Sequence, residues 1–334
     1  MEKLLEIKNL ETAFRIKDDY FNAVDKVSLD LYKNEVLAIV GESGCGKSTL
    51  ATTIMRLHNE NLTKSTGEII FKGKNILDLT EDEMNKIRTK DIGMIFQDPL
   101  SSLNPLHRIG KQIEEALIYH TELSAEERQK RVIELLTQVG IPNPERCAKQ
   151  YPHELSGGMR QRVMIAMAMS CKPSVLIADE PTTALDVTIQ AQILDLIKGL
   201  QAEMHAGIIL ITHDLGVVAE MADRVAVLYA GEVVEIGTAE QIFKNPQHPY
   251  TRSLLRSIPQ IDDEEVGEEL YVIQGMVPSL KTLDRQGCRF ANRIPWIKDE
   301  HHEHNPTLHE VEEGHHVRCT CHRNFEFEGE ENNA

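Results

Sequence analysis

A glycine-rich run constrains this chain more than any other feature of its sequence. GESGCGKST, at residues 41–49, follows a short apolar segment that ends at Val40 and precedes a stretch with helical periodicity. The run fits the pattern G-x-x-x-x-G-K-[ST], whose glycines let backbone amides turn inward around phosphate oxygens at the start of a helix. The sequence therefore predicts a nucleotide-binding α/β domain; the alternative is a glycine-rich turn before an ordinary helix.

The side chains at the end of this run carry the expected chemistry. Lys47 can reach the β- and γ-phosphates of a nucleotide, and the Ser48 hydroxyl can bind Mg²⁺. We interpret Cys45 as a neutral filler of the loop rather than a redox sensor. The residues of the predicted phosphate site are Gly41, Ser43, Gly44, Cys45, Gly46, Lys47, Ser48 and Thr49.

Composition excludes several classes of protein. The chain has 334 residues, of which 41% are hydrophobic, so it can bury a large core and is neither disordered nor a small disulfide-stapled domain. Its net charge of −17 would repel nucleic-acid phosphates, and we find no segregated basic patch in the sequence. No nucleic-acid partner is therefore expected.

The N-terminus and the apolar runs bear on location. MEKLLEIKNL is charged throughout and lacks the apolar core of a signal peptide, and no apolar run approaches the roughly 18 residues that span a bilayer. The sequence predicts a cytosolic chain with reduced thiols, without signal peptide or transmembrane segment. Any membrane role must then come through a partner.

Short apolar runs alternate with helical periodicity through the first 240 residues, as in an α/β domain with a mostly parallel central sheet. Residues 36–40, 175–179 and 208–212 are apolar enough to be buried parallel strands. Residues 187–205 have the spacing of a helix with one buried face. Together these predict a strand, helix, strand crossover.

Two further regions differ from this pattern. The opening segment, with Leu5, Ile7 and Leu10, and residues 68–71 alternate apolar and polar side chains, which is typical of an antiparallel sheet with one wet face. Residues 99–170 are mainly helical. The predicted fold is a P-loop α/β domain with a mostly parallel core sheet, an antiparallel β subdomain and an inserted helical subdomain.

The character of the chain changes toward its C-terminus, where an acidic run at residues 262–269 precedes a histidine-rich tail. We place a domain boundary near Pro259. Residues 1–258 are then the nucleotide-binding domain, with its helical subdomain at about 99–170, and residues 259–334 are a small C-terminal extension.

A second element of the site is VLIADE at residues 175–180. It ends an expected strand in two carboxylates that point in different directions, because side chains alternate along a strand. Asp179 is expected to hold Mg²⁺ and Glu180 to polarise the attacking water as general base. Acids at a strand end are otherwise a solvated cap, but the phosphate loop favours the catalytic interpretation.

LSGGMRQR, at residues 155–162, resembles the signature sequence of ATP-binding cassette (ABC) ATPases. Ser156, Gly157 and Gly158 open a helix there, so a hydroxyl, close-approaching amides and the positive end of the helix dipole form an anion site. The chain already has a phosphate loop, so a second anion site indicates ATP held between two subunits.

The resemblance assigns roles to other residues. Gln97, in IFQDP, is similar to the Q-loop glutamine and would bind Mg²⁺ beside Ser48 and Asp179, while His213 is similar to the switch histidine that contacts the γ-phosphate. Glu180, Gln97 and His213 are the implied catalytic group. A lone Gln or His at a strand end would ordinarily be a capping residue. Further implied nucleotide contacts are Ser156, Gly157, Gly158, Gln161 and, in the D-loop-like run Ala184-Leu185-Asp186, Asp186.

An aromatic side chain that stacks on adenine is the least defined part of the predicted site. The family uses an aromatic residue near its first strands. Tyr20 and Phe21 are the candidates here, and the loop FRIKDDYFNA has no fixed spacing that selects one of them.

Two longer stretches narrow the resemblance. FQDPLSSLNP at 96–105 and NPQHPYTRSLLRSIP at 245–259 resemble the ATP-binding subunits of oligopeptide and dipeptide importers, and the similarity covers nearly the whole chain. It implies ATP hydrolysis that powers peptide import from the cytoplasmic face of the membrane. The implied partners are a second ATP-binding subunit (paralogue or self), two integral membrane permease subunits and, indirectly, an extracytoplasmic solute-binding protein.

Other functions stay open at this point. The same subfamily also moves nickel and other small solutes, and ATPase subunits do not contact the cargo. A non-transport cassette ATPase that acts in DNA repair or translation is disfavoured by the single cassette and the acidity of the chain. A purely regulatory ATP switch would not need both Glu180 and His213.

In such importers the extension often carries four cysteines that bind an iron–sulfur cluster. This chain keeps Cys288 and Cys319 but has Ile294 and His301 at the other two ligand positions. Isoleucine cannot bind a metal, so a cluster would need Cys321 or a recruited histidine. The alternatives are an iron–sulfur cluster, zinc on Cys288, Cys319, Cys321 and a histidine such as His301, or no metal.

Overall fold

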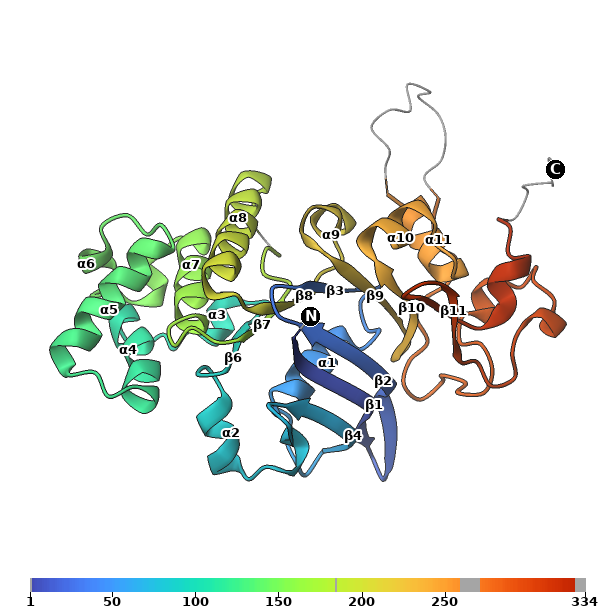
Figure 1. Ribbon diagram of the computed structural model, residues 1–334, viewed down its shortest axis with the longest axis horizontal. Coiled ribbons are helices and arrows are strands. Elements are labelled where there is room, and N and C mark those ends of the chain that lie inside the picture. Colours follow the sequence, from blue (N-terminus) through green and yellow to red (C-terminus); the bar gives the residue numbers. More distant parts are fainter. Residues whose placement is uncertain (1, 184, 259–270, 328–334) are drawn as a thin grey trace, which may run out of the picture.

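Two β-sheets organise the molecule. The structure is a computed structural model that describes residues 2–183, 185–258 and 271–327 of the chain. Within these residues the central sheet has eight strands, in the order β11-β12-β10-β9-β3-β8-β7-β6, and a second sheet has the order β2-β1-β4-β5. Figure 1 shows α8 to α11 on one side of the central strands, and α1 with the second sheet on the other.

Strands and helices alternate through most of the chain. The described strands are β1 (Lys3–Ile16), β2 (Asp19–Tyr32), β3 (Val36–Val40), β4 (Thr63–Phe71), β5 (Lys74–Asn75), β6 (Ile92–Ile95), β7 (Val175–Asp179), β8 (Gly207–Ile211), β9 (Arg224–Tyr229), β10 (Glu232–Thr238), β11 (Leu308–Glu312) and β12 (His315–Arg318). The α-helices are α1 (Lys47–Ile54), α2 (Glu81–Ile87), α3 (Pro99–Ser102), α4 (Ile109–His120), α5 (Ala125–Gln138), α6 (Pro144–Cys147), α7 (Gly157–Ala168), α8 (Val187–Met204), α9 (Leu215–Met221), α10 (Ala239–Lys244) and α11 (Pro249–Arg256). Short 3₁₀ turns are η1 (Ile76–Asp78), η2 (Pro152–Glu154), η3 (Ala291–Arg293), η4 (Asp299–His301) and η5 (Thr320–Asn324). None of these helices is long and apolar enough to cross a membrane.

Parallel pairing builds the middle of the central sheet. β3, β7 and β8 are buried along their whole length, and β8 pairs in parallel with both of the others. Along β3, Leu37 and Ile39 belong to one hydrophobic cluster, whereas Ala38 and Val40 belong to another. Both faces of the sheet are therefore covered, and the predicted parallel core with its crossover helix α8 is confirmed.

The antiparallel sheet packs beneath the central one. β1 pairs with β2 on one side and with β4 on the other. Leu5 of β1 and Ile69 of β4 share a hydrophobic cluster with Leu50 of α1 and Leu37 of β3. The predicted antiparallel subdomain is thus present, with α1 held between the two sheets.

Helices α3 to α7 form a lobe at one end of the molecule, green at the left of Figure 1. Ile113 of α4, Leu135 of α5 and Val163 of α7 are buried in a cluster that also includes Leu176 of β7. This packing joins the predicted helical subdomain to the end of the central sheet that β6 and β7 form.

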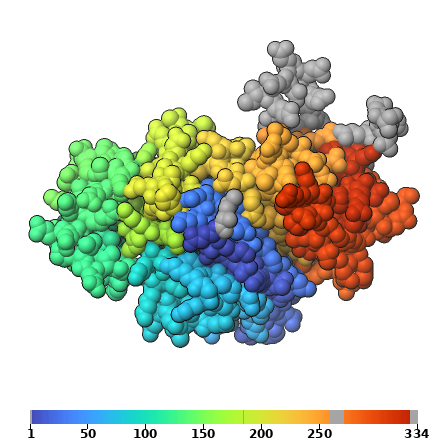
Figure 2. Space-filling model, in the orientation of Figure 1, coloured from blue at the N-terminus to red at the C-terminus, as the bar shows by residue number. Residues whose placement is uncertain are grey.

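The C-terminal extension joins the other end of the sheet. β12 pairs antiparallel with β10, and Phe290, Ile294 and Phe325 are buried in one cluster with Tyr229 and Tyr250. Figure 2 shows the extension, in red, beside orange residues near position 250 and the blue N-terminal region. The boundary near residue 259 falls at the start of residues that the structure does not describe, and it stays a prediction.

Candidate functional site

The glycine-rich run forms a loop between β3 and α1 that requires glycine at two of its positions. The φ angles of Gly41 and Gly46 are 150° and 105°, a region that L side chains rarely adopt. A Cβ atom at Gly41 would lie 2.3 Å from the Leu228 carbonyl oxygen, and one at Gly46 would lie 2.4 Å from that of Ala23. The loop is thus closely packed against β9 and β2, which holds its amides in place.

Lys47 lies within this loop. Its ammonium donates to the carbonyl oxygens of Gly41 at 2.7 Å and of Glu42 at 2.9 Å, and the side chain is buried. The charge that phosphates would meet is therefore fixed at the centre of the loop by the loop's own backbone.

Ser48 and Asp179 meet at the predicted magnesium site. The Ser48 hydroxyl donates to Asp179 Oδ1 at 3.1 Å, although the two residues come from α1 and from the end of β7. Burial raises the pKa of Asp179, and the neighbouring Glu180 raises it further, while the hydrogen bond from Ser48 lowers it. A buried carboxylate beside a hydroxyl provides the hard oxygen ligands that Mg²⁺ prefers, so the residues fit the ion.

Two predicted catalytic side chains, Gln97 and His213, and Thr183, which the sequence analysis did not single out, converge on the carboxylate of Glu180. Glu180 Oε2 accepts hydrogen bonds from Gln97 Nε2 at 2.8 Å and from Thr183 Oγ1 at 2.9 Å, and its Oε1 lies 3.2 Å from His213 Nδ1. The backbone of Glu180 has a φ of 47°, a strained conformation that clusters at functional sites. Gln97, also expected to bind Mg²⁺, directs its amide nitrogen at Glu180.

The fold explains why these groups meet. Gln97, Glu180 and His213 follow the C-terminal ends of β6, β7 and β8, which are neighbours in the sheet, and the phosphate loop follows β3. Because these strands are parallel, the segments after them leave at the same edge. The order of the parallel strands in the sheet therefore brings the residues of the site together.

The signature-like run lies on a different part of the molecule. Ser156 caps α7, where its Oγ accepts from the Met159 amide at 3.3 Å, and Ser156 and Gly157 are exposed. Figure 1 shows α7 in the helical lobe, apart from α1. The structure thus exposes this helix N-terminus to solvent, and its contact with a second subunit stays a prediction.

Gln161 and Asp186, also predicted to contact nucleotide, have other partners here. Gln161 is buried, and its amide donates to the carbonyl oxygen of Pro181, which ties α7 to the segment after Glu180. Asp186 caps α8 by accepting from the Ile189 amide at 3.0 Å. Its D-loop neighbour Ala184 lies outside the described residues.

Tyr20 and Phe21 lie on β2 and are both half-buried. The Lys64 ammonium lies 4.0 Å from the centre of the Tyr20 ring. β2 passes the phosphate loop at Ala23, two residues beyond Phe21. The stacking of one of these two rings on adenine stays a prediction, and neither ring is selected.

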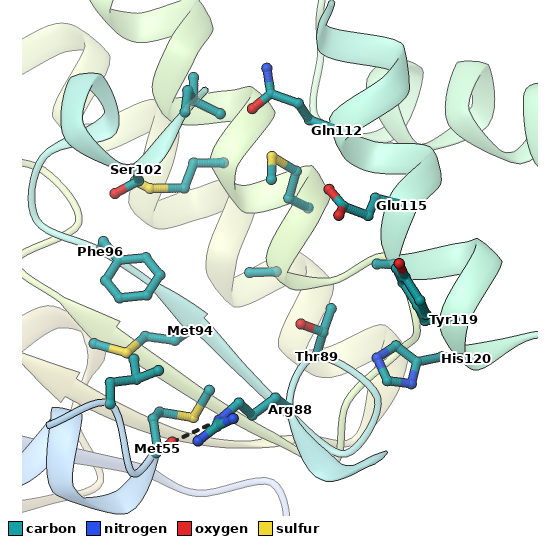
Figure 3. Close-up of a pocket in the computed structure, with 16 residues that line it drawn as sticks. Met55, Arg88, Thr89, Met94, Phe96, Ser102, Gln112, Glu115, Tyr119 and His120 are labelled. Atoms are coloured by element: carbon teal, nitrogen blue, oxygen red, sulfur yellow. Dashed lines mark hydrogen bonds between the residues drawn. The ribbon is translucent and has the colours of Figure 1, made fainter. Parts of the chain in front are cut away.

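A groove that no sequence motif indicated lies beside the Q-loop-like segment. It has a volume of about 340 Å³ and lies between β6, α4 and α7. In Figure 3, Met55, Met94 and Phe96 lie along one part of it, and Glu115 and Tyr119 come from α4. Phe96 directly precedes Gln97, so the groove and the catalytic cluster share one short segment. The residues that line the groove form no regular pattern in the sequence, so the sequence gives no signal for it.

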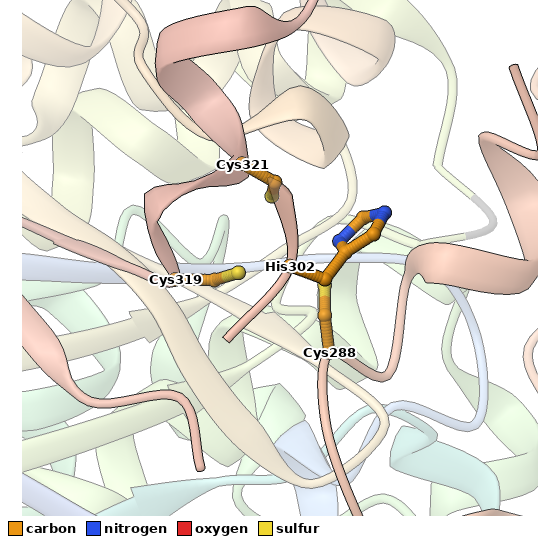
Figure 4. Close-up of side chains that lie close together, drawn as sticks. All are labelled: Cys288, His302, Cys319 and Cys321. Carbon is orange, nitrogen blue, oxygen red and sulfur yellow. The ribbon is translucent and has the colours of Figure 1, made fainter. Parts of the chain in front are cut away.

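Three cysteines and one histidine gather in the extension. The ligand atoms of Cys288, His302, Cys319 and Cys321 all lie within 4.8 Å of one another (Figure 4). Thiol hydrogen bonds from Cys288 and Cys321 lower the pKa of Cys319, and Cys319 in turn raises the pKa of Cys288 to about 12. One sulfur of the group is thus favoured as a thiolate, the form that binds metals.

His302, rather than the predicted His301, belongs to this group. His301 closes the turn η4 and lies 4.0 Å from the carboxylate of Glu300. Nδ1 of His302 is buried and has no hydrogen-bond partner among the described residues. The two histidines are adjacent in sequence, so the backbone path of the turn determines which side chain faces the cysteines. Ile294, at a position where the family has a ligand, is instead part of the buried apolar cluster.

This geometry defines a P-loop ATP-binding cassette with an added C-terminal element. The model of the ABC transporter family matches residues 24–183, and that of the oligopeptide/dipeptide transporter C-terminal region matches residues 234–300. The chain belongs to the ABC transporter family, among its oligopeptide and dipeptide transport ATP-binding proteins.

Relatives cover nearly all of the chain. The oligopeptide transport ATP-binding protein OppD of Lactococcus lactis subsp. cremoris is 53% identical over 327 residues, which cover 98% of this chain and 96% of that protein. The dipeptide transport ATP-binding protein DppD of Bacillus subtilis is 53% identical over 296 residues, 88% of each chain. A solved dimeric cassette in a post-hydrolysis state, bound to ADP and phosphate, is 33% identical, with a TM-score of 0.64 over 71% of this chain and 99% of that one.

Proposed function

We propose that this chain hydrolyses ATP to power the import of peptides through membrane permease subunits. The convergence of Gln97, Thr183 and His213 on the Glu180 carboxylate carries the hydrolytic part. The names of the relatives, which refer to oligopeptide and dipeptide transport, support peptides rather than nickel or another small solute as the cargo.

The residues of the site divide the work of hydrolysis. Lys47 and the loop amides hold the phosphates, and Ser48 and Asp179 would hold Mg²⁺, which neutralises charge on the phosphates when bound. Glu180 accepts a proton from water as the water oxygen bonds to the γ-phosphorus and the bond to ADP breaks. Gln97 and His213 keep the Glu180 carboxylate oriented toward that water.

The site is completed by a second cassette. Ser156 and Gly157 present amides and a hydroxyl at the exposed end of α7, which suits the phosphates of ATP bound to an opposite subunit. We expect two cassettes to close head to tail on two ATP molecules, with this chain paired with itself or with a paralogue. The solved relative that is a dimer with ADP and phosphate supports this arrangement.

The groove beside Phe96 is the proposed docking site for a permease on the cytoplasmic face of the membrane. Its rim carries exposed apolar side chains, Leu57 at 44% and Tyr119 at 77% exposed. Phe96 is covalently joined to Gln97, which contacts the catalytic Glu180. A cytoplasmic segment of a permease bound in this groove would contact Phe96, the residue next to Gln97. Its binding would therefore be coupled to the nucleotide site.

A test of this function is to purify the chain from native membranes with mild detergent and identify what accompanies it. The proposal expects two integral membrane subunits, a second ATPase or a second copy, and ATP-dependent uptake of labelled peptides after reconstitution with the solute-binding protein. The groove variant Tyr119→Glu should release the permeases while Tyr151→Glu, which lies on the loop before α7, should not. Recovery without any membrane protein would contradict the proposal.

The cysteine group of the extension suits a single zinc ion better than an iron–sulfur cluster. Zn–S bonds of about 2.3 Å place tetrahedral ligands about 3.8 Å apart, and all four ligand atoms here lie within 4.8 Å. A cluster would spread its ligands over several iron atoms. Metal analysis after anaerobic purification should find about one zinc per chain; a stoichiometric content of iron and sulfide, or no metal at all, would contradict this assignment.

A further inference from the structure

Residues outside the stretch that matches the ABC transporter family model contact the second residue of the phosphate loop. Glu42, in GESGCGKST, forms a two-pronged ion pair with Arg293, with Nη1 to Oε2 at 2.6 Å and Nη2 to Oε1 at 3.2 Å. The backbone amide of Glu42 donates to the Tyr250 hydroxyl at 2.7 Å. Arg293 and Tyr250 both belong to the matched C-terminal region, residues 234–300.

Arg293 is held in one orientation. Its side chain is 5% exposed, and its Nε donates to the Gln274 carbonyl oxygen at 2.7 Å. The guanidinium also lies 5.8 Å from the Tyr229 ring centre and 5.6 Å from that of Phe290. An arginine fixed by backbone and rings on one side can hold a carboxylate rigidly on the other.

Glu42 connects this clamp to the lysine that meets the phosphates. Its carboxylate contacts Arg293 of the extension, its amide contacts Tyr250 of α11, and its carbonyl oxygen accepts from Lys47 Nζ at 2.9 Å. A shift of Glu42 would therefore move an acceptor of Lys47. The carboxylate is also a negative charge on a loop that binds a polyanion, and Arg293 offsets that charge.

A second contact supports the other side of the loop. Arg289 donates to the carbonyl oxygen of Ala230 at 2.6 Å and pairs with Asp25. The next residue, Gly231, donates its amide to the Cys45 carbonyl oxygen at 2.9 Å. Arg289 and Arg293 are four residues apart, so a single short segment of the extension reaches the loop from two directions.

We propose that Arg293 is a positioning residue for the phosphate loop, so that the affinity of the site for ATP depends on the docked C-terminal extension. Arg293 acts through Glu42 and touches neither the phosphates nor the attacking water. The contacts that carry this role are the ion pair with Glu42, the Tyr250 hydrogen bond and the shared acceptor of Lys47.

The test compares Arg293→Gln, Arg293→Lys, Glu42→Gln and the double variant in the assembled complex. Arg293→Gln should raise the KM for ATP about tenfold and change kcat by less than about twofold. The lost ion pair positions the loop that binds ATP, whereas no group that takes part in the chemical step is changed. Lysine should restore part of the affinity. The double variant should return KM to within about threefold of the native value, because the uncompensated carboxylate is gone.

Arg318→Gln is the matched control. Arg318 also lies in the extension, is 14% exposed and donates to the carbonyl oxygens of Val233 and Pro306. It should lower the melting temperature and leave KM unchanged. If Arg293→Gln does not fold, Tyr250→Phe tests the neighbouring contact and should raise KM about threefold. An unchanged KM in Arg293→Gln or Tyr250→Phe, or a double variant no better than Arg293→Gln, would overturn the proposal.

Discussion

The nucleotide site and the cysteine group of the extension are built in different ways. In the first, the functional side chains lie at or just after the C-terminal ends of buried parallel strands, so the order of the sheet brings them together. In the second, Cys288, His302, Cys319 and Cys321 come from loops and 3₁₀ turns that pack against β10 and β12. The first site is thus organised by the parallel sheet, while the second group lies on irregular segments of the extension.

Removing the general base is the strongest test of the first half of this comparison. Glu180→Gln keeps the size of the side chain and loses its charge, so ATP turnover should fall about 10²- to 10⁴-fold while ATP still binds. Steady-state ATPase and nucleotide binding in the assembled complex measure this. Glu220→Gln makes the same chemical change on the exposed face of α9 and should be neutral. Near-normal turnover in Glu180→Gln would refute the assignment.

Removing one thiol tests the second half. Cys319→Ser should lower the zinc content from about one per chain to almost none and lower the melting temperature, because metal binding contributes to folding there. ATP turnover per folded chain should change by less than about twofold. Cys171→Ser alters a half-buried thiol in the cassette and should retain the metal. Unchanged zinc content in Cys319→Ser would show that the group is not a metal site.

The junction between the two regions is expected to weaken in acid. Burial lowers the pKa of His248 to about 4, well below its ordinary value of 6.5. Between these values the unfolded chain binds a proton that the folded chain excludes, so the free energy of unfolding falls as the pH drops, by about 2 kcal/mol at pH 5. Urea unfolding of the full chain at pH 7 and pH 5 measures this loss.

His248→Asn is the matched variant for that experiment. It keeps an acceptor for the Tyr250 amide, which bonds to His248 Nδ1 at 3.1 Å, and it removes the titrating ring. The difference in stability between pH 7 and pH 5 should shrink by about 2 kcal/mol in this variant. An equal pH dependence in both proteins would mean that other groups cause the acid sensitivity.

The smallest expected effect concerns how strongly Thr183 contributes to the orientation of the Glu180 carboxylate. Thr183→Ala removes the hydroxyl that donates to Glu180 at 2.9 Å and leaves the contacts of Gln97 and His213. We expect kcat to fall about two- to fivefold with KM unchanged. Thr183→Ser keeps the hydroxyl and should restore turnover. A loss as large as that of Glu180→Gln would mean that the other two contacts do not orient the carboxylate.

How much the sequence could predict follows from this difference in construction. Strand periodicity predicted the strands before Glu180 and His213, the family resemblance singled out Gln97 and His213, and parallel strands bring such segments to one edge. That part of the site therefore needed no knowledge of side-chain packing. The contact of Glu42 with Arg293 spans 251 residues of chain and involves no motif. It depends on how the extension docks, which periodicity does not describe.

Two side chains lie differently from what their predicted roles suggest, and the causes are local. His301 was predicted as a ligand and His302 occupies the place, because a 3₁₀ turn sets which of two adjacent side chains points inward. Gln161 was assigned to the nucleotide; the helix phase of α7 buries it against Pro181, and its contact with nucleotide stays a prediction. In both cases the residue type was informative, and the direction of the side chain required the three-dimensional path.

The pairing of β12 with β10 bears on solubility. β10 is buried and apolar at Val233, Val234 and Ile236. Trimming the chain at residue 258 would turn β10 into an edge strand with unpaired backbone groups, the kind of edge that templates aggregation. In the native chain the edge is β11, whose outward-lying Glu310 and Glu312 carry charge that discourages further pairing. The extension thus covers a strand edge that would otherwise be open to non-native strand pairing.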